Sequence, residues 1–174
     1  MTITSALTPL SWERMAIAYL GLGANLGERR ETIARALEAL DAAGVRVTAR
    51  SPLYETDPVA PDPQPPYLNA AARVETDLPA LVLLELCLDV ERVLGRRRPP
   101  GQPAAARVID IDLLLYDDEI IDEPPDLVVP HPRLLARPFV RIPLADVALP
   151  GLVHPVNGAP LDVAAPDPSV RSAP

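Results

Sequence analysis

Residues 16–25 read AIAYLGLGAN, an apolar stretch that predicts a buried β-strand. Because side chains alternate along a strand, Ala16, Ala18 and Leu20 are expected to share one face. A helix is predicted over residues 28–43, where apolar side chains recur every three or four positions and a glycine follows as a stop. A strand that leads directly into an amphipathic helix predicts a domain in which helices pack on a sheet.

The rest of the sequence extends this unit to the order βαββαβ. Further strands are predicted over residues 45–54, 67–76 and 107–116, and a second helix over residues 78–94. The order is typical of a ferredoxin-like α+β sandwich, with a mainly antiparallel sheet and both helices on one face. Proline-rich stretches at residues 57–66 and 96–106 predict irregular loops.

Smaller additions are expected toward the carboxyl end. They are a hairpin turn at Asp117 and Asp118, a short helical segment at residues 133–135 and a last strand over residues 139–144. Residues 151–174 are rich in Pro, Asp, Ala and Ser, which predicts a weakly structured tail. Residues 1–14 lie outside the pattern, so we expect a single domain over residues 15–150 between an N-terminal extension and that tail.

Composition and charge argue against nucleic acids and membranes as partners of this protein. The formal net charge is −8 and every basic residue is an arginine, so the overall field would repel nucleic acids and anionic membranes. No stretch approaches the ~20 apolar residues of a membrane span, and the lone Cys87 lies in an apolar periodic segment, where a buried thiol is expected. These features favour a cytoplasmic protein, expected as a monomer, that meets polyanionic ligands through a local arginine cluster.

The motif with the most specific chemistry is Asp110-Ile111-Asp112, inside a predicted strand. Residues two apart point the same way, so both carboxylates would leave the sheet on one face while Ile109, Ile111 and Leu113 take the other. Two hard oxygen ligands held in this way suit Mg²⁺, which binds through few carboxylates together with waters and substrate phosphates. The alternative is a solvated strand face, because isolated acidic pairs are common.

An arginine cluster adjoins the acidic pair. Arg107 lies three residues before Asp110, and a run from Arg96 to Arg98 begins the loop that leads into the same strand. Guanidinium groups hold phosphate oxygens by paired hydrogen bonds, so a metal with a triphosphate fits both features. Taken alone, the arginine run is explained by the preference of helix C-termini for cations. The glycine-rich turn after the first strand is no standard phosphate loop, because its spacing is not G-x-G-x-x-G and a Walker A loop needs a lysine.

A set of ordered segments carries a resemblance to a known family: LGLGANLG, YETDPVAPDPQPPYLNAA, ERVLGRRR, RVIDIDLLLY and VPHPRLLARPFVRIPL. From about Met15 to Pro150 the chain resembles 6-hydroxymethyl-7,8-dihydropterin pyrophosphokinase. The resemblance implies the ferredoxin-like fold, transfer of pyrophosphate from ATP to the pterin in folate biosynthesis, and two Mg²⁺ ions as cofactors.

The same resemblance implies roles for individual residues. Asp110 and Asp112 would be the metal ligands, and with Arg98 and Arg107 they would form the catalytic set. ATP would be bound by Glu91, Arg96, Arg98, Arg107, Ile111, His131 and Arg137, and the pterin by Pro58, Val59, Ala60, Tyr67, Asn69 and Phe139. Aromatic faces around a flat heterocycle, with one amide at its edge, agree with this pterin set. Without the family, the aromatic residues would be assigned to the core, the amide to a strand edge and His131 to a turn.

One segment departs from the family pattern, which usually has a basic residue and Trp-Gly-Pro where this chain has Pro103-Ala104-Ala105-Ala106. The departure predicts a loop that closes less tightly over the ligands. Two other classes of function remain as alternatives: a noncatalytic ferredoxin-like module would not need the acidic pair, and a metal-dependent phosphohydrolase would have little use for Tyr67, Asn69 and Phe139. Pterin-dependent formation of AMP would separate all three.

Overall fold

The computed structural model describes residues 15–58, 63–97 and 106–174. In chain order its elements are β1 (Ala16–Ala24), α1 (Arg29–Ala42), β2 (Arg46–Arg50), β3 (Tyr54–Thr56), β4 (Tyr67–Thr76), α2 (Ala80–Val93), β5 (Asp110–Tyr116), β6 (Ile121–Glu123), β7 (Leu127–Val129), α3 (Pro138–Val147) and β8 (Val170–Ser172). The predictions for β1, α1, β4, α2 and β5 are confirmed, with small differences at their ends. Within the described ranges, no helix has the length and apolar character needed to cross a membrane.

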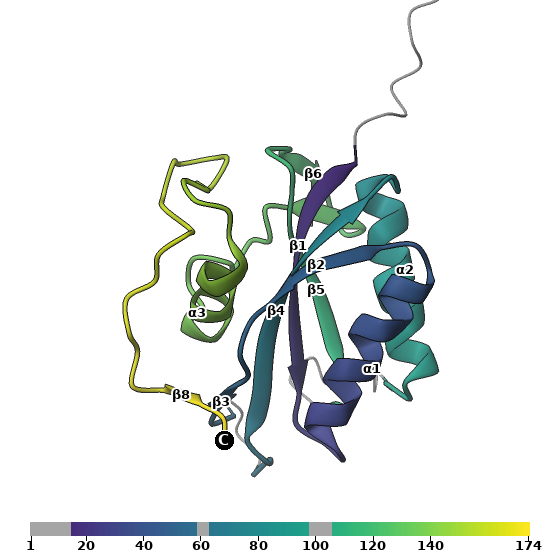
Figure 1. Cartoon of the computed structure of the whole chain (residues 1–174), viewed down its shortest axis with the longest axis vertical. Coiled ribbons are helices and arrows are strands. Elements are labelled where there is room, and N and C mark those ends of the chain that lie inside the picture. Colours follow the sequence, from purple (N-terminus) through teal and green to yellow (C-terminus); the bar gives the residue numbers. More distant parts are fainter. Residues whose placement is uncertain (1–14, 59–62, 98–105) are drawn as a thin grey trace, which may run out of the picture.

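The main sheet has the strand order β5-β1-β4-β3-β8, and β2 also pairs with β4. Its neighbouring strands pair antiparallel throughout. The strands of the expected βαββαβ unit therefore lie in the order β5-β1-β4-β2, which is consistent with the predicted ferredoxin-like sandwich. The helices α1 and α2 cover one face of the sheet, and α3 lies on the other (Figure 1).

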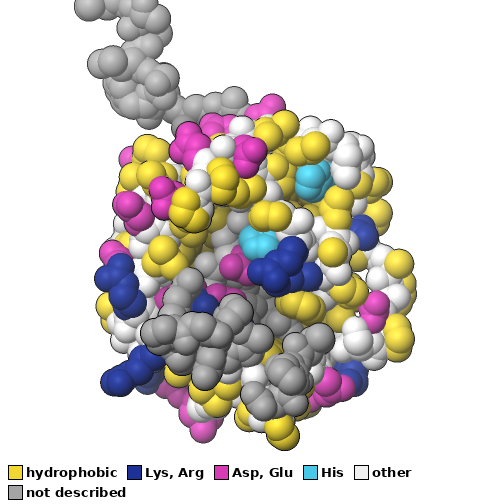
Figure 2. Space-filling view, turned by 180° about the vertical axis from the view of Figure 1, so that it is seen from behind, with side chains coloured by type: hydrophobic (Ala, Val, Ile, Leu, Met, Phe, Trp, Pro, Cys, Tyr) yellow, Lys and Arg dark blue, Asp and Glu magenta, His cyan; other side chains and the backbone are white. Residues whose placement is uncertain are grey.

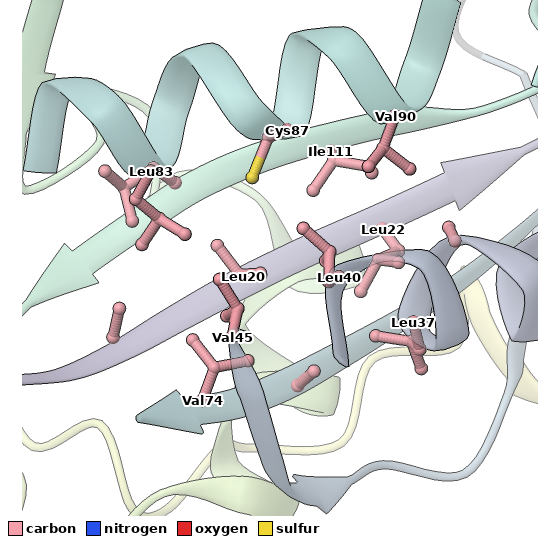
Figure 3. Packing of buried hydrophobic residues seen from close by; sticks show 14 of the residues in the cluster. Leu20, Leu22, Leu37, Leu40, Val45, Val74, Leu83, Cys87, Val90 and Ile111 are labelled. Carbon is pink, nitrogen blue, oxygen red and sulfur yellow. The ribbon is translucent and has the colours of Figure 1, made fainter. Parts of the chain in front are cut away.

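Separate hydrophobic clusters pack the two faces. Ala16, Ala18 and Leu20 join the cluster on the side of α1 and α2, where Figure 3 shows Leu20. Cys87 is fully buried in the same cluster, so the prediction of a buried thiol is confirmed. Tyr19 belongs to the cluster on the side of α3. The alternation predicted for the first strand thus decides which residues face which helices.

The strand β5 keeps its predicted alternation up to a bulge. Ile109, Ile111 and Leu113 are buried on the side of α1 and α2, which leaves the aspartates between them on the side of α3. Farther along, the register with β1 shifts, and two successive residues, Leu114 and Leu115, both pack in the cluster beside α3. The polar face of β5 is therefore confined to its first residues.

Several of the predicted elements differ in the structure. The strand expected over residues 45–54 is divided into β2 and β3, because a segment with Pro52 separates them. The hairpin expected at Asp117 is wrong, because β6 pairs with β7 instead of β5. Asp117 instead ends β5 beside the start of β1, where its carboxylate accepts the N–H of Ile17 at 2.9 Å. Residues 133–135 form a turn and not a short helix.

The last strand expected over residues 139–144 is in fact the helix α3. The buried positions of this helix are Val140, Pro143, Leu144 and Val147, a helical spacing. Pro138 occupies the first turn, where a proline's fixed φ favours a helix. An apolar run as short as residues 139–144 does not separate a strand from a helix, and the longer spacing does.

The segment after residue 150 is not the weakly structured tail that its composition predicted. Leu161 is only 1% exposed and packs in the cluster beside α3. Near the end of the chain, the Val170 N–H donates to the Asp167 carbonyl at 3.0 Å. Asp followed by Pro is the common start of such a turn, and this turn directs β8 onto β3. The C-terminal segment is therefore packed against the domain.

Candidate active site

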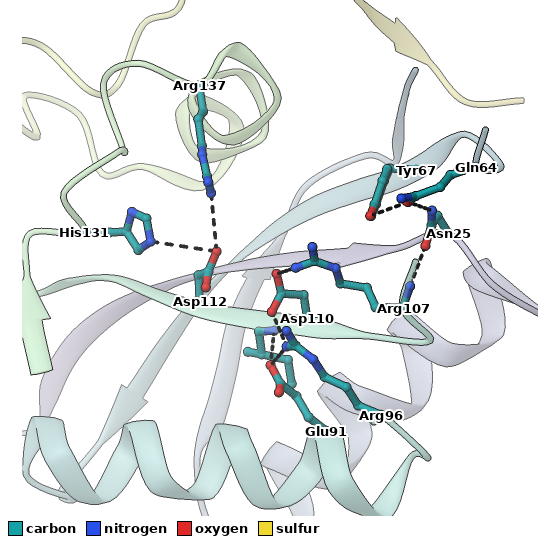
Figure 4. A network of polar contacts seen from close by, with 11 residues as sticks. Asn25, Gln64, Tyr67, Glu91, Arg96, Arg107, Asp110, Asp112, His131 and Arg137 are labelled. Carbon is teal, nitrogen blue, oxygen red and sulfur yellow. Dashed lines mark hydrogen bonds and ion pairs between the residues drawn. The ribbon is translucent and has the colours of Figure 1, made fainter. Parts of the chain in front are cut away.

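The acidic pair lies at the start of β5, on the side of the sheet that faces α3 (Figure 4). The cross-strand neighbours of Asp110 and Asp112 in β1 are Gly23 and Gly21, and the neighbour of Gly23 in β4 is Asn69. Asp110, Gly23 and Asn69 therefore form one row across three strands, each about 4.8 Å from the next. Because glycine has no side chain, the sheet surface between the carboxylate and the amide is bare. On the face drawn in Figure 2, acidic, basic and histidine side chains meet around a hollow.

Asp110 is paired with two arginines. Arg107 Nη1 lies 2.5 Å from its Oδ2, and Arg96 Nη1 pairs with its Oδ1. Burial by itself would raise the pKa of Asp110, but the two guanidinium groups outweigh burial and hold this pKa below its ordinary value. Asp110 is therefore ionised at neutral pH, the form in which a carboxylate binds a cation.

A histidine and an arginine lie near Asp112 at a longer distance. His131 Nε2 and Arg137 Nη1 are each 4.0 Å from its Oδ2. Burial, followed by the charge of Asp110, raises the pKa of Asp112 to about 6. Two carboxylates that repel each other in this way form a donor set whose repulsion a divalent cation relieves.

The pair fits Mg²⁺ better than a metal that needs a complete protein cage. Across residues 15–58, 63–97 and 106–174, no group of three or more Asp, Glu, His or Cys side chains could hold a metal ion. Mg²⁺ keeps several waters and is commonly bound through one or two carboxylates plus substrate phosphates. Asp110 and Asp112 supply such a partial set on one face of β5.

The segment after β7 brings a histidine and an arginine to the acidic pair. The His131 N–H donates to the Leu114 carbonyl at 2.9 Å, which fixes this segment to the edge of β5. Burial, together with the charges of Arg137 and Arg133, lowers the pKa of His131, so the imidazole is neutral at pH 7. The Arg137 guanidinium also lies 5.5 Å from the centre of the Phe139 ring. Arg137 therefore connects the acidic pair with the aromatic ring on α3.

A buried carboxylate of α2 supports the edge strand. Glu91 is 2% exposed, and its Oε1 accepts the Ile111 N–H at 2.7 Å and Arg96 Nη1 at 2.6 Å. The Ile111 side chain is itself buried on the side of α1 and α2. Both residues were predicted to bind ATP, and the structure places them beneath the acidic pair. There they hold β5 and Arg96 in position.

Asn25 was not predicted as a site residue, yet it joins the two loops that border the site (Figure 4). Its side chain is 1% exposed, and its Nδ2 donates to Gln64 Oε1 and to the Pro65 carbonyl, both at 3.2 Å. Its Oδ1 accepts the Arg107 N–H at 2.7 Å, and its own N–H donates to the Arg107 carbonyl at 3.0 Å. One buried amide thus ties the end of the first proline-rich loop to the end of the second.

Two of the predicted pterin residues, Asn69 and Tyr67, lie at the other end of the row. Asn69 is 5% exposed, and its Nδ2 donates to Thr56 Oγ1 at 2.9 Å and to the Tyr54 carbonyl at 3.4 Å. The Tyr67 ring centre lies 5.8 Å from the Arg107 guanidinium. Thr56 is a further polar neighbour that the sequence did not reveal.

Some predicted residues lie at or beyond the limits of the described residues. Pro58 is the last described residue before the first gap, whereas Val59, Ala60 and Arg98 lie outside the described residues. Pro103, Ala104 and Ala105 of the divergent loop also lie outside them.

Comparisons with known proteins show which family the chain resembles. Residues 19–149 match the family described as 7,8-dihydro-6-hydroxymethylpterin-pyrophosphokinase (HPPK). The chain is 45% identical over 141 residues to the 2-amino-4-hydroxy-6-hydroxymethyldihydropteridine pyrophosphokinase of Methylorubrum extorquens, covering 80% of this chain and 86% of that protein. It is 42% identical over 132 residues to the protein of the same name from Bacillus subtilis, covering 75% and 77%.

The fold has matches among solved structures. A Plasmodium falciparum HPPK-DHPS structure with pterin and p-hydroxybenzoate superposes with a TM-score of 0.64 at 18% identity. The match covers 86% of this chain and 43% of that chain, so this chain spans less than half of the longer protein. The family match and the relatives above 40% identity lead to one conclusion: the chain belongs to the 7,8-dihydro-6-hydroxymethylpterin-pyrophosphokinase family.

Proposed function

We propose that this chain uses ATP and Mg²⁺ to place a pyrophosphoryl group on 6-hydroxymethyl-7,8-dihydropterin, giving AMP and the pterin diphosphate. Pyrophosphate transfer to this pterin, a step of folate biosynthesis, follows from membership of the family. Beyond that step, we propose that ATP is the donor, that Mg²⁺ is the metal and that the residues below bind them.

The observation that carries the proposal is the row Asp110, Gly23 and Asn69 across β5, β1 and β4. It has a cation-binding carboxylate at one end, an amide at the other and a bare sheet surface between them. A phosphate chain and a flat ring that react with each other need such a surface, on which each ligand reaches its own polar group. Holding two reactants in line in this way supplies much of the acceleration in phosphoryl transfer.

Asp110 and Asp112 would hold the metal. When bound there, Mg²⁺ would offset the negative charge of the phosphate oxygens. Arg96 and Arg107 are the cations paired with Asp110 in the structure, and their donors are suited to phosphate oxygens. Arg137 and the neutral His131 border Asp112 from the opposite side. The chain thus has arginines on both sides of the position proposed for the triphosphate, and Arg98 is proposed to add to them.

At the other end, Asn69 would read the hydrogen-bonding edge of the pterin, and Tyr67 and Phe139 would border its ring. Pro58, Val59 and Ala60 would add contacts from the first loop. The hydroxymethyl oxygen then attacks the β-phosphorus of ATP, the bond from that phosphorus to the oxygen of the α-phosphate breaks, and AMP leaves. The hydroxyl proton passes to solvent or to a carboxylate of the acidic pair in the same transfer, and no covalent enzyme intermediate forms.

The experiment is an assay for AMP with purified protein, ATP and Mg²⁺, run with and without the pterin. We expect AMP to form only when pterin and Mg²⁺ are both present. A phosphohydrolase would release product from ATP without the pterin, and a regulatory module would form none in any mixture. Light scattering on the same preparation tests the expected monomer.

A further inference from the structure

The C-terminal strand β8 lies beyond residues 19–149, which match the family, and it adds to the edge of the main sheet beside β3 (Figure 1). It pairs with β3 residue for residue, from Thr56 with Val170 to Tyr54 with Ser172. The next residue continues the contact, because the Ala173 N–H donates to the carbonyl before β3 at 2.9 Å. The C-terminal segment therefore forms a regular antiparallel strand on the edge of the sheet.

One side chain of β8 reaches the start of the first proline-rich loop. Arg171 forms two hydrogen bonds with Asp57, from Nη2 to Oδ1 at 2.9 Å and from Nη1 to Oδ2 at 3.2 Å. Its guanidinium also lies 4.0 Å from Glu55 in β3. Exposed ion pairs of this kind add little stability, but a bidentate arginine fixes geometry. Arg171 therefore links β8 to the residue that follows β3.

The strand β3 in turn orients the amide of Asn69. A carbonyl only accepts hydrogen bonds, so the Tyr54 carbonyl requires the amide nitrogen, and not the oxygen, to face β3. The Thr56 hydroxyl accepts from the same nitrogen at 2.9 Å. The amide oxygen is then left beside Gly23, where it lies 3.5 Å from the position that a Cβ would take. Which end of the amide meets a ligand is thus decided by β3.

We propose that β8 is a positioning element for Asn69, which it orients by holding β3 in register. The inference rests on the proposed function only for the identity of the ligand that Asn69 meets. The strand β3 spans only Tyr54–Thr56, and edge strands this short open easily when they are paired on one side alone. With β8 on its outer side, β3 keeps Thr56 and Tyr54 against the amide nitrogen, and the amide is held in one orientation before the ligand arrives.

The test uses the full chain with two substitutions of one residue. Arg171→Pro removes both a backbone N–H of β8 and the guanidinium, whereas Arg171→Gln removes only the guanidinium and its contacts with Asp57 and Glu55. Arg46→Gln is the matched control, because Arg46 pairs with Glu75 where β2 meets β4, away from Asn69. The first readout is the side-chain amide resonance of Asn69 in the ligand-free protein, which can be assigned because the chain has three asparagines and two glutamines. The second is the KM for pterin and for ATP, together with kcat.

Arg171→Pro is expected to shift the Asn69 amide resonance and to raise the KM for pterin by roughly tenfold, the effect of one lost hydrogen bond, with kcat and the KM for ATP nearly unchanged. Arg171→Gln should cause smaller changes in the same direction, and Arg46→Gln none. If Arg171→Pro does not fold, the resonance of the Arg171→Gln protein decides. An unchanged Asn69 resonance alongside normal pterin-dependent AMP formation overturns the role of β8 and leaves the proposed function standing. A shifted resonance supports the positioning role even if the wild-type protein makes no AMP, an outcome that contradicts the proposed function instead.

Discussion

The two faces of the main sheet use the same strands for opposite purposes. On the side of α1 and α2, β1 and β5 present aliphatic residues such as Leu20 and Ile111, which are almost completely buried. On the other side the same strands present Gly23 and Asp110. One face is filled with apolar side chains, and the other is bare or charged where the ligands are proposed to bind.

This difference shows how stability and function are separated within one strand. Alternation places each residue on one face only, so the aspartates can carry charge without disturbing the core behind them. Behind the aspartates, the buried carboxylate of Glu91 in α2 accepts the Ile111 N–H and holds β5 in position. Substitutions on one face should therefore change catalysis, and substitutions on the other should change the free energy of unfolding.

The largest effect is expected on the charged face. Asp112→Asn keeps the shape of the side chain but removes a proposed metal ligand, and kcat should fall by about 10²–10³, as it does when other groups that stabilise transition-state charge are removed. Steady-state AMP formation at saturating Mg²⁺ measures this. Asp122→Asn, on the exposed strand β6, is the control and should keep full activity. Normal turnover of Asp112→Asn would exclude this residue as a metal ligand.

The opposite result is expected on the filled face. Leu83 of α2 is fully buried in the cluster beside Leu20, so Leu83→Ala should lower the free energy of unfolding by about 2–5 kcal/mol. Urea denaturation measures the loss, and kcat at a temperature where the variant stays folded should change little. A large loss of kcat without a loss of stability would show that the two faces are not independent.

The link between the loops should show an intermediate effect. Asn25→Ala removes the side chain that accepts the Arg107 N–H and donates to the Pro65 carbonyl. The free energy of unfolding should therefore fall by about 1–3 kcal/mol. Binding of both ATP and pterin should weaken in calorimetry, because this amide holds both loops. Asn157→Ala is the matched control, since Asn157 is exposed and its side chain accepts the N–H of Ala159, two residues away. Weaker binding of a single ligand would contradict the coupling of the loops.

The parts of this site that sequence could predict depend on short periodic patterns. The spacing of Asp110 and Asp112 within a strand was enough to place both carboxylates on one face, as the structure confirms. Asn25 could not be predicted, because an asparagine after a glycine-rich strand is equally typical of an exposed turn. Its partners are distant in sequence, and the pairing depends on tertiary structure alone.

The C-terminal elements were missed for different reasons. Residues 139–144 alone do not separate a strand from the helix α3, because the helical spacing is clear only when Val147 is included. Composition predicted a weakly structured tail, but composition does not register a turn such as the one at Asp167 or an edge such as β3 that lacks an outer partner until β8 pairs with it. The turn at Asp167 and the open edge of β3 determine the place of β8, and composition reports neither.

The smallest effect is expected on the bare surface. Gly23→Ala adds a methyl group 3.5 Å from Asn69 Oδ1, an ordinary contact distance, so the fold should stand while pterin affinity falls by roughly threefold to tenfold, the equivalent of about 1 kcal/mol. Gly21→Ala places the same methyl group against Leu114 at 3.4 Å and should leave pterin affinity closer to that of the wild type. Calorimetry with the pterin compares the affinities of the two variants. Equal affinities would show that the pterin ring does not lie against Gly23.

The most direct test of the central claim is a crystal structure of the protein with Mg²⁺, a nonhydrolysable ATP analogue and the pterin. We expect Mg²⁺ coordinated by Asp110 and Asp112, and the pterin over Gly23 with its polar edge at Asn69. A pterin bound on any other surface, or Mg²⁺ bound without either aspartate, would contradict the claim that this row across β5, β1 and β4 is the active site.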